Sequence, residues 1–160
     1  MVRKALFILV LAGLVLATVS LSQDRKISPV TTAMLQKPSD NDWLMYSRTY
    51  DAQRYSPLTQ IDKQNVNKLR EAWSVELPAG QTETIPIVHD GVMYTIQDPD
   101  DVVALDPVTG RVFWMYNYTP SPDSRPCCGR LSRGVAVLGD KVFIGTIDAR
   151  LIALDAKSGK

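Results

Sequence analysis

The sequence predicts an all-β fold, a β-propeller built from four-stranded blades, for three reasons. After residue 83 the chain is a series of short runs rich in β-branched residues, separated by Asp, Gly and Pro. One such unit recurs after 49 residues. Outside the apolar N-terminus, no stretch of ten or more residues has the pattern of an amphipathic helix. Short strands joined by tight turns at regular spacing are typical of repeated antiparallel sheets.

The composition is that of a globular protein, and it excludes several function classes. Of the 160 residues, 45% are hydrophobic and 22% are charged, with a formal net charge of +1. This near-balance argues against a nucleic-acid binder driven by a basic surface and against an acidic disordered tail. One His and two Cys are too few for a zinc framework of those residues. A Ser-His-Asp hydrolase would have to use His89, which its V-H-D-G context places in a turn.

The first 22 residues have the features of a signal peptide. Arg3 and Lys4 precede an uncharged apolar run at 5–19, and small residues follow, so cleavage before Gln23 is expected. The alternative is an uncleaved membrane anchor, although the run is shorter than the roughly 20 residues of a spanning helix. We therefore expect export to the periplasm and no stable membrane span after cleavage. In that compartment adjacent cysteines can stay oxidised.

The body of the chain divides at about residue 83. Residues 65–73 suggest a short helical turn that leads into a strand at 73–77. Beyond them, seven strands are predicted, at 84–88, 91–96, 102–106, 111–117, 134–139, 141–147 and 150–155. We accordingly expect a signal peptide at 1–22, a lead-in at 23–42 and part of a propeller at 43–160.

An internal repeat indicates the architecture. Residues 102–114 (VVALDPVTGRVFW) correspond to 151–160 (LIALDAKSGK), and residues 91–101 correspond to 140–150. In each unit a strand ends in Ala-Leu-Asp, and a turn closed by Gly follows. A repeat of about 40 to 50 residues with four short strands is typical of a propeller blade. The alternative, a lone meander in a sandwich, does not account for the repeat.

The turn residues of the repeat have definite roles in such a blade. Asp106 can accept hydrogen bonds from the amides of residues 108–110, and Gly110 supplies a positive φ. Trp114 would pack its ring against a neighbouring blade and fill the wedge between two sheets. Together these positions resemble the tryptophan-docking motif of quinoprotein propellers: Ala104, Asp106, Thr109, Gly110 and Trp114.

Residues 40–160 as a whole resemble the pyrroloquinoline-quinone (PQQ)-dependent alcohol dehydrogenases, the methanol and ethanol dehydrogenase family. The most specific part is Cys127-Cys128-Gly129 followed by Arg133. The resemblance implies an eight-bladed quinoprotein propeller, of which this chain covers about the first two blades, with PQQ repeats near 83–114 and 135–160 and a truncated C-terminus. It also implies oxidation of primary alcohols to aldehydes by hydride transfer to the quinone.

The adjacent Cys127 and Cys128 are the most unusual feature of the composition. Neighbouring Cα atoms lie about 3.8 Å apart, below the usual disulfide span of roughly 4.4 to 6.8 Å. A bond between them would close a strained ring that restricts the unfolded chain little. Two unpaired buried thiols, or bonds to other cysteines, are the alternatives. In the family the vicinal disulfide stacks on one face of the quinone, and the resemblance implies the same here.

Glu83 and Arg133 are the other candidates for cofactor binding. A guanidinium can fork onto a carboxylate or a quinone oxygen, and Glu83, just before a strand, can accept from a cofactor ring N–H or order a water. From spacing alone, Glu83 and Arg133 are better interpreted as exposed charges at turns than as cofactor ligands. In the family, the matching glutamate and arginine both contact the cofactor. The neighbouring Arg130 and Ser132 are not assigned a role.

The resemblance implies further components outside this chain. In the family, Ca²⁺ or a lanthanide polarises the quinone oxygens and an Asp acts as base. We expect those groups beyond residue 160, and so no catalytic residue and no metal ligand within 1–160. The expected partners are a small alcohol and a cytochrome c electron acceptor, with no nucleic acid. The rival class is a non-catalytic propeller scaffold for envelope protein assembly. A sensor domain is less favoured.

Overall fold

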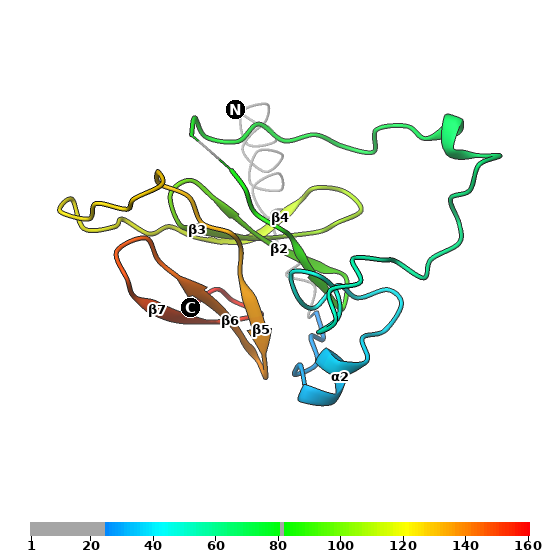
Figure 1. The fold of residues 1–160 in the computed structure, drawn as a ribbon, viewed down its shortest axis with the longest axis horizontal. Helices are drawn as coiled ribbons and strands as arrows, with labels where there is room; N and C mark the ends of the chain where they lie inside the picture. The colour runs from blue at the N-terminus through cyan, green and yellow to red at the C-terminus, as the bar shows by residue number, and fades with distance from the viewer. Residues whose placement is uncertain (1–24, 81) are drawn as a thin grey trace, which may run out of the picture.

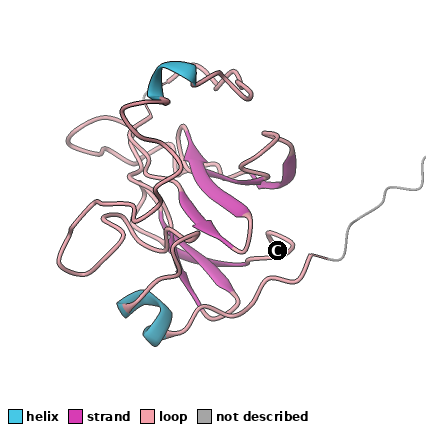
Figure 2. Ribbon diagram, turned by 90° about the vertical axis from the view of Figure 1, so that its right-hand side faces the viewer, coloured by secondary structure: helices cyan, strands magenta, loops and turns pink. Residues whose placement is uncertain are grey.

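The computed structural model describes residues 25–80 and 82–160, and this part of the chain is almost entirely β. Two antiparallel sheets lie next to each other (Figure 1). The helices among the described residues are both short, α2 (Thr32–Gln36) and the 3-10 turn η1 (Val66–Lys68). Figure 2 shows them at opposite edges of the molecule, away from the strands. The predicted all-β class is confirmed, while the predicted signal peptide at 1–22 lies outside the described residues.

Each sheet is a meander in which consecutive strands pair. The first consists of β1 (Ile87–His89), β2 (Val92–Gln97), β3 (Asp101–Leu105) and β4 (Val112–Tyr116). The second consists of β5 (Ala136–Leu138), β6 (Lys141–Gly145) and β7 (Leu151–Asp155). All seven strands predicted after residue 83 are therefore present, and the repeated units form two successive sheets as the blade interpretation requires.

Two local predictions differ from the structure. The predicted strand at 73–77 is not paired with any described strand. Residues 54–79 form a long arm that extends away from the sheets around η1 (Figure 1) and returns to the first sheet at Trp73, whose Nε1 donates to the Pro107 carbonyl at 3.0 Å. His89 was expected in a turn, but it is the last residue of β1 and only 2% exposed. The turn itself is Asp90-Gly91, whose φ values of 46° and 71° suit a two-residue hairpin loop.

The core lies between the two sheets and the lead-in. It contains Ile87, Val92, Tyr94, Ile96, Val102 and Ala104 from the first sheet, Val137, Val142, Ile144 and Leu154 from the second, and Val30 and Leu44 from the lead-in. Side chains on β2 alternate between buried and half-buried positions along most of the strand, as a strand with one face on a core does. The hydroxyl of Tyr94 donates to the Ala156 carbonyl at 3.1 Å and thereby ties the sheets together.

The turn after β3 is held by its aspartate. Asp106 Oδ1 accepts from the backbone N–H of Val108 at 2.8 Å and of Thr109 at 3.3 Å, while the Gly110 N–H donates to the Asp106 carbonyl oxygen at 2.8 Å. Asp155 organises the corresponding turn of the second sheet, where it accepts from the Ser158 N–H at 2.8 Å. The hydrogen bond from the Val108 amide lowers the pKa of Asp106, and a hydrogen bond from the Ser158 hydroxyl, followed by that from its amide, lowers the pKa of Asp155.

Two tryptophans cover these turns in the same way. The Trp114 ring lies on Gly159, where an added Cβ would come within 2.5 Å of it, and its Nε1 donates to the Ala156 carbonyl at 3.1 Å. The Trp73 ring lies on Gly110, where a Cβ would come within 2.7 Å. Trp73 therefore covers the turn of the first sheet in the same way that Trp114 covers the turn of the second. Its sequence context had suggested only the start of a strand.

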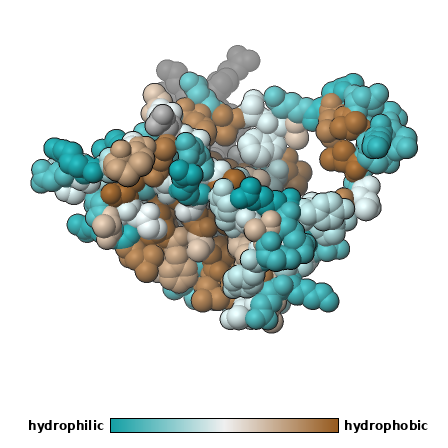
Figure 3. Space-filling view, viewed as in Figure 1, coloured by the Kyte–Doolittle hydropathy of each residue, from teal (hydrophilic) through white to brown (hydrophobic). Residues whose placement is uncertain are grey.

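Much of the arm at 54–79 is exposed, including several apolar side chains. Tyr55, Leu58, Ile61, Val66 and Leu69 are each about half exposed or more, and apolar surface is visible around η1 in Figure 3. Within the part of the chain that the structure describes, no helix has the length and apolar character needed to cross a membrane.

Two glycine substitutions separate the stability effect of the Trp73 ring on Gly110 from the effect of backbone strain. Gly110→Ala and Gly91→Ala both place a side chain at a φ near +70°, but a Cβ at Gly91 meets nothing within 4 Å. We expect Gly91→Ala to cost about 1–2 kcal/mol of unfolding free energy, and Gly110→Ala to cost about 1–3 kcal/mol more because of overpacking. Denaturant unfolding of the full-length variants measures both. Equal losses would show that the ring contact contributes nothing.

Candidate functional site

The predicted cofactor residues lie on two segments that lead into the first strand of each sheet. Glu83 precedes β1, and the loop at 117–135, which joins β4 to β5, carries the cysteine pair and Arg133. Both segments enter their sheets at the same end, and the Ile85 N–H donates to the Arg133 carbonyl at 3.3 Å across the gap. The antiparallel repeat therefore brings positions about 50 residues apart in sequence side by side.

Glu83 and Arg133 form an ion pair at this end of the sheets. Arg133 Nη2 lies 3.3 Å from Glu83 Oε2, and the two side chains are 71% and 50% exposed. An ion pair so open to water contributes little to stability. Both groups are consequently free to exchange their mutual contact for a bound ligand.

The cysteine pair lies within electrostatic reach of the same arginine. A hydrogen bond with Cys127 and partial desolvation raise the pKa of the Cys128 thiol, while the positive charge of Arg133 opposes that rise. Both thiols are free and exposed in the structure, unlike the buried pair that was one alternative from sequence. The vicinal disulfide stays a prediction. Arg133 thus pairs with a carboxylate and acts electrostatically on the Cys128 thiol.

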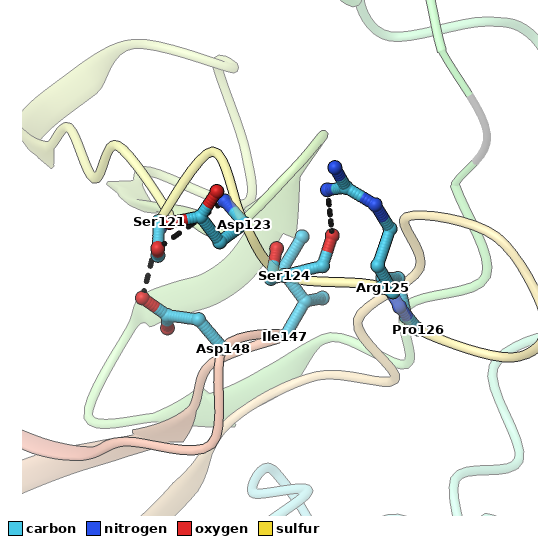
Figure 4. A pocket seen from close by; sticks show the side chains of 7 residues that line it. All are labelled: Ser121, Asp123, Ser124, Arg125, Pro126, Ile147 and Asp148. Carbon is cyan, nitrogen blue, oxygen red and sulfur yellow. Dashed lines mark hydrogen bonds between the residues drawn. The ribbon is translucent and has the colours of Figure 1, made fainter.

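A pocket of about 400 Å³ is lined in large part by the same loop (Figure 4). It is lined by Ser121, Asp123, Ser124, Arg125, Pro126, Ile147 and Asp148. Asp148 anchors the loop, because its carboxylate accepts from the Tyr118 hydroxyl at 2.8 Å, from the Ser121 N–H at 3.0 Å and from the Thr146 hydroxyl. The hydrogen bond from Thr146, followed by that from the Ser121 amide, lowers the pKa of Asp148 to about 2.

The sequence analysis missed the aspartates at this end of the sheets. Asp100, in the turn between β2 and β3, is fully buried, and its Oδ2 accepts from the Ile147 N–H of the second sheet at 2.9 Å. Its Oδ1 is buried and finds no hydrogen-bond partner in the described part of the chain, and desolvation raises the pKa of Asp100. Arg130, left unassigned from the sequence, is close enough for its charge to oppose that shift. The acidic run at 98–101 was the only signal available.

The arrangement suits a planar, anionic ligand with both donor and acceptor groups. Arg133 offers a charged fork, Glu83 offers an acceptor, and Cys127 and Cys128 offer a polarisable surface. Within the described residues, one group of side chains is arranged so that it could hold a metal ion, Asp42 with His89 and Asp90. It lies at the opposite end of β1 and so does not belong to this cluster.

Comparisons with known proteins identify relatives of this chain. The family model described as PQQ, glucose/ethanol/alcohol dehydrogenase, β-propeller domain, matches residues 43–160. The chain is 46% identical over 122 residues to quinohemoprotein alcohol dehydrogenase ADH IIB of Pseudomonas putida, covering 74% of this chain and 18% of that protein. It is 39% identical over 155 residues to the quinoprotein ethanol dehydrogenase of Pseudomonas putida, covering 93% of this chain and 25% of that protein.

Solved structures give the same result. The quinohemoprotein alcohol dehydrogenase ADHIIG of Pseudomonas putida HK5 superposes with a TM-score of 0.73 at 42% identity, over 84% of this chain and 21% of that one. A europium-containing methanol dehydrogenase superposes with a TM-score of 0.73 at 35% identity, over 80% and 23%. The chain thus spans between about a sixth and a quarter of the length of the relatives it matches.

Asp148 makes the anchoring of the pocket loop dependent on pH. Its folded-state pKa is depressed from 3.8 to about 2, so its contribution to stability is complete above pH 4 and is lost as the pH falls towards 2. We expect Asp148→Asn to be less stable than the wild type at neutral pH and to lose less stability between pH 4 and pH 2. Unfolding measurements across that range test this. Asp123→Asn, in the same pocket, is the control and should follow the wild-type profile; a wild-type profile for Asp148→Asn would contradict the assignment.

Proposed function

The chain belongs to the PQQ-dependent glucose/ethanol/alcohol dehydrogenase family, in its β-propeller domain, and from this premise we propose that it forms one wall of the cofactor site of an exported alcohol dehydrogenase. The whole protein would oxidise primary alcohols to aldehydes. Residues 1–160 alone are not expected to turn over, since the catalytic base is expected elsewhere in the protein.

One observation carries the proposal. Glu83 and Arg133 come from two separate segments, yet they form an ion pair at one end of the two sheets, and the charge of Arg133 acts on the Cys128 thiol. Arg133 is mostly exposed and its ion-pair partner among the described residues is an exposed carboxylate, so this pair makes little contribution to folding. Such an arrangement is readily explained by ligand binding and has no evident structural purpose.

The chemistry of these groups fits PQQ, a planar quinone with carboxylates and a ring N–H. When bound, PQQ supplies the acceptor for the hydride of the alcohol. Arg133 would hold a carboxylate or quinone oxygen by its charged fork. Glu83 would accept from the ring N–H, and the cysteine pair, joined as a vicinal disulfide, would pack against one face of the ring. The role of this chain is therefore to bind and orient the cofactor.

Other components of the reaction are proposed to lie in the rest of the protein. The whole enzyme would use Ca²⁺ or a lanthanide beside the quinone, and the europium in a related methanol dehydrogenase makes a lanthanide reasonable. We propose a cytochrome c as electron acceptor, consistent with the quinohemoprotein relatives. A non-catalytic scaffold for envelope assembly shares the docking turns, but it gives no reason for an exposed ion pair of Arg133 and Glu83 whose charge acts on Cys128.

Substitution of Arg133 tests the site in the full-length protein. Arg133→Ala removes a charge-assisted fork, and such bonds contribute about 1.5–3 kcal/mol, so PQQ affinity should fall roughly ten- to a hundredfold. Arg133→Lys should restore only part of the affinity, because a point charge does not reproduce the fork. The measurement is titration of the cofactor-free protein with PQQ.

The matched control for this titration is Arg125→Ala. Arg125 lies in the same loop, but its Nη1 donates to the carbonyls of Pro122 and Ser124 and it has no proposed contact with the cofactor. Its removal should leave PQQ affinity unchanged. Native circular dichroism with unaltered affinity in Arg133→Ala would exclude Arg133 from the site and favour the scaffold.

Export and the vicinal disulfide are proposed together, because the second depends on an oxidising compartment. Mass spectrometry of the protein isolated from the periplasm should find its N-terminus at Gln23. The peptide with Cys127 and Cys128 should be two hydrogens lighter until reductant is added. An intact Met1 in a cytoplasmic pool would argue against export, and free thiols in freshly isolated periplasmic protein would argue against the disulfide.

A further inference from the structure

We propose that His89, Asp42 and Asp90 form a binding site for a divalent transition-metal ion of the Zn²⁺ type. The three side chains meet where the lead-in crosses the end of β1, and one ligand atom from each lies within 4.8 Å of the other two. The site lies at the opposite end of β1 from the proposed cofactor residues. The inference therefore goes beyond the proposed dehydrogenase function and does not depend on it.

The first argument concerns the protonation of the His89 ring. His89 is 2% exposed, and its Nε2 lies 2.8 Å from the Ser28 backbone carbonyl oxygen. Since a carbonyl oxygen can only accept, Nε2 must carry the proton and donate it. In the neutral ring this leaves a bare lone pair on Nδ1. Metal-binding histidines are oriented in this way, with one nitrogen donating to a carbonyl and the other free to bind the ion.

The second argument concerns what the lone pair faces. Nδ1 is buried and has no hydrogen-bond partner among the described residues, and Asp42 Oδ2 lies 3.6 Å from it. That distance is too long for a hydrogen bond. Two ligand atoms, each about 2.0–2.1 Å from a tetrahedral ion, are separated by about 3.4 Å. The gap between Nδ1 and Oδ2 is thus the size that a zinc-like ion spans.

The two carboxylates are held in place by other contacts. Asp42 is only 10% exposed, and its Oδ1 accepts from the Asp90 N–H at 3.2 Å, which leaves Oδ2 directed at the histidine. Asp90 Oδ2 accepts from the Ser28 N–H at 2.7 Å and from the Ser28 hydroxyl at 2.6 Å. Asp90 Oδ2 also lies 3.5 Å from His89 Nε2, the nitrogen that donates to Ser28. Asp90 is partly exposed, so it would complete the site through its other oxygen, Oδ1, from the solvent side and leave a position for water.

Charge and donor type select the class of ion. A buried lone pair that faces a carboxylate without a proton or cation between them is costly, and a divalent cation removes the repulsion. One imidazole nitrogen with carboxylate oxygens suits Zn²⁺, Co²⁺ or Ni²⁺, whereas Ca²⁺ and Mg²⁺ prefer oxygen ligands throughout. The chain has too few His and Cys for a site made from those residues alone, but a site rich in carboxylates needs only one His.

The second sheet shows that these residues are not required by the repeat. In the hairpin between β5 and β6, Leu138 occupies the position of His89 and Gly139 that of Asp90. That hairpin also has a loop of two residues, and it forms without a titratable side chain at the positions of His89 and Asp90. The cluster is therefore an addition to the blade. Its ion would join Asp42 of the lead-in to the end of β1 and strengthen their docking.

Zn²⁺ binding by the full-length holoenzyme tests the proposal. The protein is dialysed without chelator, so that its own cofactor metal is retained, and titrated with Zn²⁺ against a chromophoric competitor. The wild type should bind one equivalent that Asp42→Asn and His89→Gln bind at least about a hundredfold more weakly. Co²⁺ should give a tetrahedral ligand-field spectrum in the wild type only. Asp140→Asn, in the matching hairpin of the second sheet, is the control and should bind as the wild type does.

Each outcome decides the matter. Loss of the same single equivalent in both variants, with native circular dichroism and an unchanged Asp140→Asn, supports the site. Identical Zn²⁺ binding in the wild type and both variants overturns it. If the variants do not fold, the wild type alone is sufficient, because failure to take up Zn²⁺ or to give the Co²⁺ spectrum also overturns the proposal.

Discussion

The packing of a tryptophan ring on a glycine turn is the contact on which the rest of the structure depends. Trp114, from the last strand of the first sheet, covers Gly159 at the turn of the second, and the Tyr94 hydroxyl donates to the same Ala156 carbonyl as the Trp114 indole. A side chain in place of the glycine hydrogen would collide with the ring. The two sheets are therefore fixed in one relative position. This packing also sets the distance between the loops at the ends of the sheets.

The candidate site is a consequence of this fixed spacing. Glu83 and Arg133 each precede the first strand of a different sheet, so the distance between them is set by how the sheets pack and not by their own interaction, which is weak in water. Asp148 and Asp100 then secure the adjoining loops through backbone amides. The apolar core and the aromatic rings hold the sheets together, which leaves the exposed charges available for a ligand.

The two ends of β1 therefore differ in chemistry. Its start adjoins exposed charges of opposite sign around Arg133. Its end holds a buried imidazole between two carboxylates and the lead-in. A strand of three residues separates them.

The sequence by itself determined the strands, the repeat and the turns, because these depend on residues close together in the chain. Alternation along β2 and the Asp106 turn are of this kind, and the resemblance added Glu83, Arg133 and the cysteines as candidates. Only the tertiary structure decided which partners distant in sequence would meet. The stretch at 73–77 has strand character but pairs with nothing described, Trp73 instead caps Gly110, and His89 is buried against Asp42. Local pattern carries no information on such contacts, since they arise only when sheets and lead-in pack together.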